Sequence, residues 1–457
     1  MINSRKKTLH NGLRVVAVEM PHLHCVEIAV YIKVGGRDDP DDKAGLSHFL
    51  EHMLFRGTRE FPSNLELETA FEAIGGCVNA TTDEESTCYF SRVHPDHVAE
   101  GVELFASMLL RPTLKGIDIE KRIISEEALE DINEQGEETN PHNLSSRLLW
   151  PGHPLGKPTI GYLDTIKSFA VEDLKTHLDS FYAPSNAVLV LAGDIKAETA
   201  FAAASKAFGE WRGNASLPLL PAPSQQSRPQ SLFVKDSDSQ VHLLIAFRGF
   251  PRSDPRITAG RLIRRILCGG GSSRLHLRLR EELGVVYSVD ASISAYEETG
   301  SFAIELSVLR ENLALSIREV LNETMRLAKE PIPDTELARV KKCYIYDLEY
   351  GRDSAYEMQA RYGWGELMGI CRSIEEDRAE AENVNAEGIR SAAGTLFAPH
   401  NLNLVSVGPW KNAERRETEG ILKRYMKEFQ GKAPISAVST RDVSPGTSLP
   451  NPLHRPE

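Results

Sequence analysis

The sequence predicts an α+β protein made of two homologous halves, each a mixed, antiparallel-rich sheet with helices packed on one side. Three observations lead to this prediction: the length, an internal repeat, and strand-like segments that group apart from helix-like segments within each half. A chain of 457 residues is too long for one hydrophobic core. Its composition, 41% hydrophobic and 26% charged, is typical of globular proteins.

The internal repeat relates residues 26–45 to residues 241–260 at a constant offset of 215, without a gap. Each stretch contains an apolar strand-like run, then a glycine, then Asp-Pro, and then Ala-Gly. Several matches in one register indicate two related halves rather than a chance likeness. The matched pairs include Val26 with Val241, Pro40 with Pro255, and Gly45 with Gly260.

The elements of the first half follow from hydrophobic pattern and turn signals. Runs of β-branched residues bounded by turns predict strands, and apolar residues at helical spacing predict helices, one of which ends at Gly75-Gly76. Strands are expected at residues 13–18, 25–34, 77–80, 86–93 and 188–192, and helices at residues 44–56, 65–74, 97–110 and 118–134.

Composition divides the chain into domains. Residues 1–215 are expected to form one domain and residues 233–430 its homologue, joined by a Pro-, Ser- and Ala-rich linker at 216–232. The stretch 431–457 is rich in Pro and Ser and poor in large apolar residues, so it is expected to be disordered.

Charge, apolar pattern and cysteine content limit the partners and the compartment that we expect. A net charge of −12 argues against nucleic acid. No run of about 18 apolar residues predicts a membrane span. The six cysteines form no C-x-x-C pair, and no apolar signal segment follows the N-terminus. We therefore expect a cytoplasmic protein with reduced cysteines.

A metal-binding motif lies in the predicted helix 44–56. His48 and His52 are four residues apart, so they share one helix face and can bind one ion. Glu51 lies beside them and can take a proton from a metal-bound water without being a ligand. The alternative is a solvated face with two surface histidines, but the flanking residues are apolar and indicate a mostly buried helix.

A catalytic site needs a third ligand, which the predicted helix 118–134 can supply. Glu120 and Glu127 are seven apart and share a face, and Ile123 and Ile124 between them are expected to point toward the core. Helical spacing alone does not choose among Glu120, Glu126 and Glu127.

These motifs resemble the pitrilysin/insulinase family, especially its short, mitochondrial-processing-peptidase-like branch, over about residues 8 to 430. In that family H-x-x-E-H is followed, some seventy-odd residues later, by a glutamate ligand, and Glu127 lies 75 residues after His52. The resemblance therefore implies one zinc ion per chain, held by His48, His52 and Glu127. It also implies that Glu120 orients a ligand or handles protons, and that Glu51 activates the water.

The resemblance extends to the activity and to substrate contacts. It implies a zinc-dependent endopeptidase, folded as a clamshell, that cuts unfolded or short peptides. Asn79 and Ala80 match the family's edge strand that pairs with the substrate backbone. Arg280 and Tyr287, seven apart, match a pair that holds the substrate near the scissile carbonyl. The alternative for this pair is an ordinary helix-end arginine and a core tyrosine.

The second half has no equivalent metal site. The 215 offset, shifted by one near the third ligand, replaces every ligand, although one glutamate persists. The second half is therefore expected to serve packing or substrate binding. The aligned pairs are His48 with Ile263, Glu51 with Ile266, His52 with Leu267, Glu120 with Glu336, and Glu127 with Cys343.

Two further questions concern assembly and rival functions. Because one chain carries both the metal motif and the Arg280–Tyr287 pair, we expect a homodimer, with a heterodimer containing an inactive family member as the alternative. The rival functions are a non-catalytic scaffold and a peptide-binding subunit with structural zinc. The intact motif argues against the first, and three ligands rather than four argue against the second.

Overall fold

The computed structural model describes residues 3–215, 219–223 and 226–431. The predicted disordered segment falls, apart from Gly431, outside the described residues, as do residues 216–218 and 224–225 of the predicted linker. Among the described helices, none combines the length and the apolar character that crossing a membrane requires.

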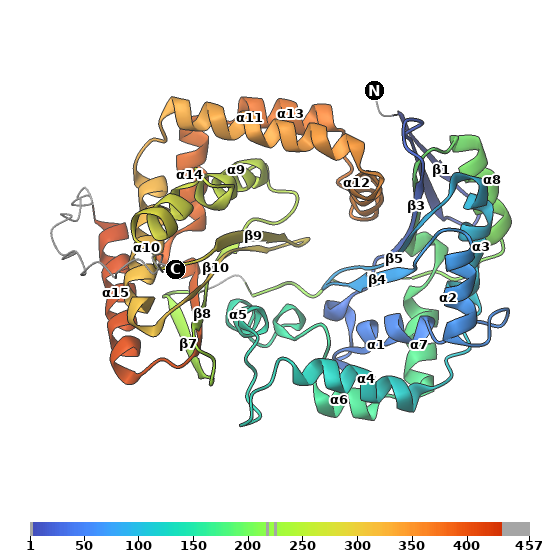
Figure 1. Ribbon diagram of the computed structural model, residues 1–457, viewed down its shortest axis with the longest axis horizontal. Coiled ribbons are helices and arrows are strands. Elements are labelled where there is room, and N and C mark those ends of the chain that lie inside the picture. Colours follow the sequence, from blue (N-terminus) through green and yellow to red (C-terminus); the bar gives the residue numbers. More distant parts are fainter. Residues whose placement is uncertain (1–2, 216–218, 224–225, 432–457) are drawn as a thin grey trace, which may run out of the picture.

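The chain folds into two sheets with the same strand order, which confirms the predicted fold class (Figure 1). The first sheet is six-stranded, in the order β1-β2-β6-β3-β5-β4, and the second is five-stranded, in the order β7-β11-β8-β10-β9. Without β1 the two orders correspond strand by strand. In each sheet one strand pair is parallel, β2 with β6 and β7 with β11, and the other pairs are antiparallel.

The helices and strands alternate similarly in the two halves. The first half contains β1 (Asn3–Thr8), β2 (Arg14–Glu19), β3 (Val26–Ile32), α1 (Leu46–Leu54), α2 (Asn64–Ala73), β4 (Asn79–Thr82), β5 (Thr87–Val93), α3 (Val98–Leu110), α4 (Ile117–Leu129), α5 (Pro141–Leu149), α6 (Leu163–Ser168), α7 (Val171–Phe181), β6 (Ala187–Gly193) and α8 (Ala197–Phe208). The second contains β7 (Gln230–Lys235), β8 (Val241–Gly249), α9 (Ile257–Cys268), the π-helix η6 (His276–Glu282), β9 (Val289–Ala295), β10 (Gly300–Val308), α10 (Leu313–Lys329), α11 (Asp334–Tyr350), α12 (Ala355–Leu367), α13 (Ile374–Asn383), α14 (Ala386–Leu396), β11 (Leu402–Gly408) and α15 (Asn412–Gln430).

The two halves exchange one helix each. Helix α12 of the second half packs on β2, β3 and β6 of the first sheet, and α5 of the first half packs on β8 and β11 of the second sheet (Figure 1). The helices of each half cover one face of its own sheet, as predicted, and the exchanged helix covers the other. Strands β3 and β6 are buried at every position because both faces of the sheet are covered.

The structure differs from the expected strands and helices at several places, including the three that follow. Strand β1 precedes the first predicted strand. Helix α4 ends at Leu129 rather than at Glu134, because a turn closed by Gly136, with φ of +79°, reverses the chain there. Strand β7 begins at Gln230, inside the predicted linker.

Candidate metal centre

The start of α1 is fixed by a buried carboxylate. Asp39 accepts hydrogen bonds from the backbone N–H of Gly45 at 2.8 Å and of Ser47 at 2.9 Å, and from the Ser47 hydroxyl at 2.7 Å. Burial raises the pKa of Asp39 to about 7, although these hydrogen bonds oppose the rise. Gly45 has φ of +94°, and a Cβ there would lie 2.4 Å from the Ile160 carbonyl oxygen, so only glycine fits.

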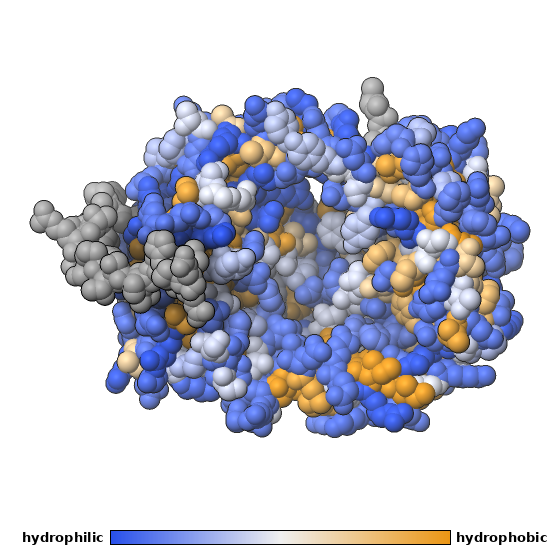
Figure 2. All heavy atoms as spheres, viewed as in Figure 1, coloured by the Kyte–Doolittle hydropathy of each residue, from blue (hydrophilic) through white to orange (hydrophobic). Residues whose placement is uncertain are grey.

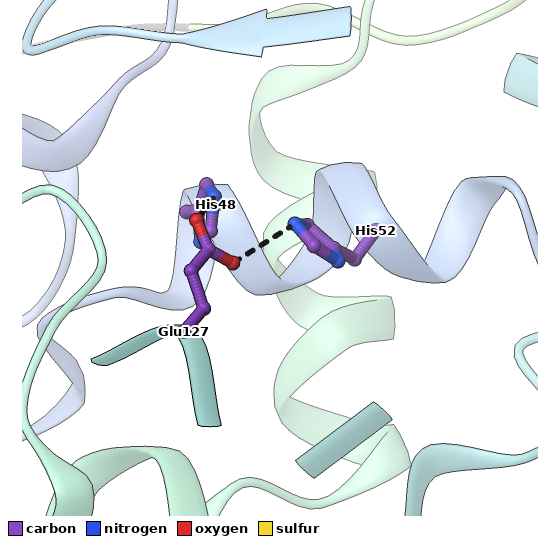
Figure 3. Close-up of side chains that lie close together, drawn as sticks. All are labelled: His48, His52 and Glu127. Atoms are coloured by element: carbon purple, nitrogen blue, oxygen red, sulfur yellow. Dashed lines mark ion pairs between the residues drawn. The ribbon is translucent and has the colours of Figure 1, made fainter. Parts of the chain in front are cut away.

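The structure brings together the three predicted ligands. One donor atom from each of His48, His52 and Glu127 lies within 4.8 Å of the other two. The Glu127 carboxylate reaches from α4 toward both imidazoles, 3.8 Å from His48 Nε2 and 3.7 Å from His52 Nε2 (Figure 3). Two atoms bound tetrahedrally at about 2.1 Å from one zinc ion are roughly 3.4 Å apart, so these side chains fit zinc with a small adjustment.

The surroundings shift the pKa values of the two histidines in opposite directions. Burial, together with the neighbouring His52, lowers the pKa of His48 to about 4, so His48 stays neutral. Burial also disfavours charge on His52, but the hydrogen bond to Glu120 and the nearby carboxylates outweigh it and raise the pKa of His52. His52 uses Nδ1 for the Glu120 bond, at 2.9 Å, which leaves Nε2 directed at Glu127.

Glu120 contacts a ligand rather than the open side of the site. This carboxylate is buried, and it pairs with His52 Nδ1 and with the Arg56 guanidinium. Burial alone would raise the pKa of Glu120, but these two partners hold it below its usual value. A carboxylate that fixes the ring of a metal-binding histidine is a common feature of zinc sites. Arg56 was not predicted, although it follows His52 by four residues, one helical turn.

Glu51 lies on α1 next to His52 and is only 8% exposed. Burial raises the pKa of Glu51, and a hydrogen bond of 2.5 Å donated by the Thr82 hydroxyl opposes this rise. Thr82 ends strand β4, so this strand orients the Glu51 carboxylate. Thr82 was not predicted as a site residue. Its place could have been inferred from the two-residue period of a strand, which puts Thr82 on the same face as Ala80.

Strand β4 forms an edge of the first sheet, because β5 is its only partner among the described strands. Asn79 is exposed, and its side chain donates to the Cys77 carbonyl oxygen at 3.2 Å. Ala80 is half-buried against the core of the first half. The backbone on the outer side of β4 is therefore free to pair with another strand.

Arg280 and Tyr287 lie together in the second half. The Arg280 guanidinium carbon is 5.4 Å from the centroid of the Tyr287 ring, and Tyr287 is 85% exposed. The ion pair of Arg280 is with Glu281, at 3.8 Å. These contacts join the pair to each other and not to the three metal donors. Ile263, Ile266 and Leu267, which align with the α1 motif, are buried in the second core.

A cavity of about 1250 Å³ lies between the halves. The surface view shows a hollow at the centre of the molecule (Figure 2). Both halves line the cavity: Glu84 and Glu85 come from the β4–β5 hairpin, while Arg261, Tyr356 and Trp364 come from α9 and α12.

Known proteins resemble this chain in sequence and in fold. Residues 14–162 match the model of the insulinase family, peptidase family M16, and residues 168–343 match that of the peptidase M16 inactive domain. The chain is 30% identical to an uncharacterized zinc protease of Bacillus subtilis, covering 86% of this chain and 95% of that protein. It is 28% identical to an uncharacterized zinc protease of Rickettsia felis, covering 88% and 96%.

Solved structures have the same fold. The crystal structure of a protease from Helicobacter pylori has a TM-score of 0.82 at 20% identity and covers 89% of this chain and 100% of that one. The crystal structure of a peptidase M16 inactive domain from Pseudomonas fluorescens has a TM-score of 0.80 at 20% identity, covering 90% and 99%. By its sequence match to the Bacillus zinc protease and to both family models, the chain belongs to the insulinase family, peptidase family M16.

Proposed function

We propose that this protein is a zinc-dependent endopeptidase that hydrolyses unfolded or short peptides. The observation that carries the proposal is the convergence of His48, His52 and Glu127 beside the buried, unligated Glu51. A bound zinc ion would supply a Lewis acid that lowers the pKa of a water ligand to about 7. Three protein ligands leave a coordination position open, which is typical of catalytic rather than structural zinc.

The surrounding side chains divide the remaining tasks. Glu51, whose pKa is raised by burial, accepts and returns a proton, which typically accelerates a reaction by about 10² to 10⁴. Thr82 fixes the orientation of the Glu51 carboxylate. Glu120 fixes the His52 ring and its tautomer, so it acts on a ligand and does not itself contact the substrate.

The free edge of β4 is the proposed binding surface for the substrate. An extended peptide pairs with the backbone at Asn79 and Ala80 as one more strand of the first sheet. Backbone pairing reads few side chains and requires an unpaired substrate backbone. Folded domains do not offer one.

Arg280 and Tyr287 are proposed to hold the peptide and the scissile carbonyl. Their exposure leaves them free to do so. Because their contacts within the chain do not reach the metal donors, the proposed assembly is a homodimer in which Arg280 and Tyr287 act on the partner's site. A heterodimer with an inactive family member is the alternative.

The proposed location is the cytoplasm. The six cysteines are all free thiols, as expected in a reducing compartment: Cys25, Cys77, Cys88, Cys268, Cys343 and Cys371.

The rival function is a scaffold or peptide-binding subunit. The description of the second family model as an inactive domain fits residues 168–343, where the buried Ile263 and Leu267 stand at the positions aligned with the two histidines. The complete donor set of the first half favours catalysis, because a scaffold has no need of it.

The test is digestion of a degenerate peptide library by the purified, zinc-loaded chain, with and without a chelator. We expect cleavage that chelation abolishes and zinc restores. A casein-like unfolded protein should be cut, whereas a compact folded domain should survive. Stoichiometric zinc without any cleavage would favour the peptide-binding alternative.

A further inference from the structure

Four charged side chains meet where the two halves join. Arg37 and Glu85 belong to the first half, and Arg252 and Glu298 to the second. Glu85 pairs with both Arg37 and Arg252, and Arg37 also pairs with Glu298 at 2.7 Å. The side chains of Arg37, Glu85 and Arg252 are between 5% and 8% exposed, so this charge cluster is buried and its charges balance.

The four residues of the charge cluster occupy corresponding positions in the two halves. Arg252 lies 215 positions after Arg37, and Glu298 lies 213 positions after Glu85. Glu85 is in the turn between β4 and β5, and Glu298 is in the corresponding turn between β9 and β10. The arginine of each half therefore pairs with the glutamate of the other, in a reciprocal arrangement across the boundary.

Only one of these two turns is connected to a candidate catalytic residue. The turn before β5 is held by the backbone of Gly36 and Arg37. Their N–H groups donate to the carbonyl oxygens of Asp83 and Glu84, each at 3.0 Å. Strand β4 enters this turn through Thr82, which donates to Glu51. In the second half, the position aligned with Glu51 is the buried Ile266.

We propose that Glu85 is a positioning residue: its ion pairs with Arg37 and Arg252 fix the β4–β5 hairpin and thereby hold Thr82 against Glu51. This inference rests on the proposed function of Glu51 and deepens it. The second half thus contributes to catalysis through Arg252, although it carries no metal ligand. Removing the Glu85 charge leaves the buried Arg252 guanidinium without its carboxylate partner, while Arg37 keeps the Glu298 carboxylate. A buried charge without a partner is costly, so the Arg252 side chain should move away and release the hairpin.

The test compares Glu85→Gln with Glu297→Gln in the zinc-loaded, full-length protein. Glu297 is a matched control, because its carboxylate also crosses the boundary, to Lys33 at 3.1 Å, but is exposed. The Glu297 backbone N–H donates to Glu85 Oε1 at 3.2 Å, and the side-chain substitution leaves this N–H in place. We expect Glu85→Gln to lower kcat by at least about tenfold with zinc content unchanged, and Glu297→Gln to behave as wild type.

Thr82→Val should lower kcat by a similar factor. The double variant Glu85→Gln/Thr82→Val should be no less active than the less active of the two single variants. Multiplied losses in the double variant would overturn the route through Thr82.

A second measurement does not depend on peptidase activity. Amide hydrogen exchange of residues 79–87 should be at least about tenfold faster in Glu85→Gln than in wild type, and unchanged in Glu297→Gln. Equal exchange in all three proteins overturns the proposal even if the enzyme is active. If exchange is faster in Glu85→Gln but the wild-type protein cuts no peptide, the connection between the hairpin and the second half is supported. The proposed peptidase function is then refuted.

If Glu85→Gln does not fold, Arg252→Gln serves in its place. This variant removes the ion pair between Glu85 and the second half but keeps Arg37 as a counter-ion for Glu85. The same faster exchange is expected, and its absence would overturn the proposal.

Discussion

The three metal donors differ in how strongly neighbouring side chains constrain them. His52 is oriented by Glu120, which is itself held by Arg56, and His48 projects from the same well-packed helix. Glu127 is 46% exposed, and its carboxylate faces the two imidazoles. The preorganisation of the site therefore depends mainly on the pair formed by His52 and Glu120.

Glu120→Gln should weaken zinc binding about 10- to 100-fold, because a neutral amide holds the His52 ring less firmly and makes it less basic. Zinc affinity is measured by competition with a chelator of known affinity. Glu126→Gln is the matched control, since Glu126 lies on the same helix and is exposed. Equal zinc affinity in both variants would contradict the role given to Glu120.

Zinc affinity should fall as the solution becomes more acidic, because a proton and zinc compete for His52. The pKa of metal-free His52 is raised above its usual value of about 6.5, so competition begins at a higher pH than for an isolated histidine. Below that pKa the affinity should drop about tenfold per pH unit. Glu120→Gln removes a cause of the raised pKa and should move the onset to lower pH. Titration of affinity against pH in both proteins checks this, and an identical onset would contradict it.

At the residue scale, the sequence predicted the contacts that follow from spacing along one helix or from the family resemblance. It placed His48 and His52 on one face, and the resemblance selected Glu127, which the structure brings to them. It did not predict Arg56 or Thr82, because their partners come from distant segments. The expectation that Ile123 points to the core was wrong: Ile123 is 46% exposed, whereas Ile124 is fully buried.

At the scale of elements, α12 holds the first sheet through close packing at a glycine. A Cβ on Gly363 would lie 2.6 Å from Tyr31 Cε2 and from Val190 Cγ1. Gly363→Ala should therefore lower the free energy of unfolding by about 1–3 kcal/mol, despite the better helix propensity of alanine. Chemical denaturation measures this.

Gly394 on α14 provides the control for that substitution. A Cβ there meets no atom within 4 Å, so Gly394→Ala should stabilise the protein by about 0.5–1 kcal/mol. If the two substitutions changed stability by the same amount and sign, the packing of α12 on the sheet would not limit stability.

Among the elements, the most strongly patterned ones were predictable and the exchange of helices was not. The buried strands β3 and β6 and the helix α1 agree with their predicted positions within a few residues. Nothing in the apolar pattern of α5 or α12 specifies which sheet it covers, because both sheets offer similar apolar faces. Strand β1 was missed because its residues are polar and exposed at all six positions.

At the scale of the whole molecule, the repeat predicted two similar halves, and the structure shows two sheets of matching order. If the Arg280–Tyr287 pair acts on the partner chain in a homodimer, two defective chains should complement each other. Mixed Arg280→Ala and Glu51→Gln chains should recover about a quarter of wild-type activity at equal ratio, because half the dimers are mixed and each has one complete site. Each variant alone should be nearly inactive.

The control for complementation is a mixture of Glu51→Gln with the double variant Glu51→Gln/Arg280→Ala, which can form no complete site. Native mass spectrometry verifies that mixed dimers form. Mixed dimers without recovered activity would show that the pair does not act across the dimer. Full activity of Arg280→Ala alone would return Arg280 to a structural role.

The most direct test of the central claim measures zinc content and peptide hydrolysis together in Glu51→Gln and in His48→Ala. We expect Glu51→Gln to keep about one zinc ion per chain while kcat falls by at least about a hundredfold, because Glu51 moves a proton and holds no metal. His48→Ala should lose both zinc and activity. A Glu51→Gln protein that loses its zinc, or that cuts peptides at the wild-type rate, would contradict the assignment of the site.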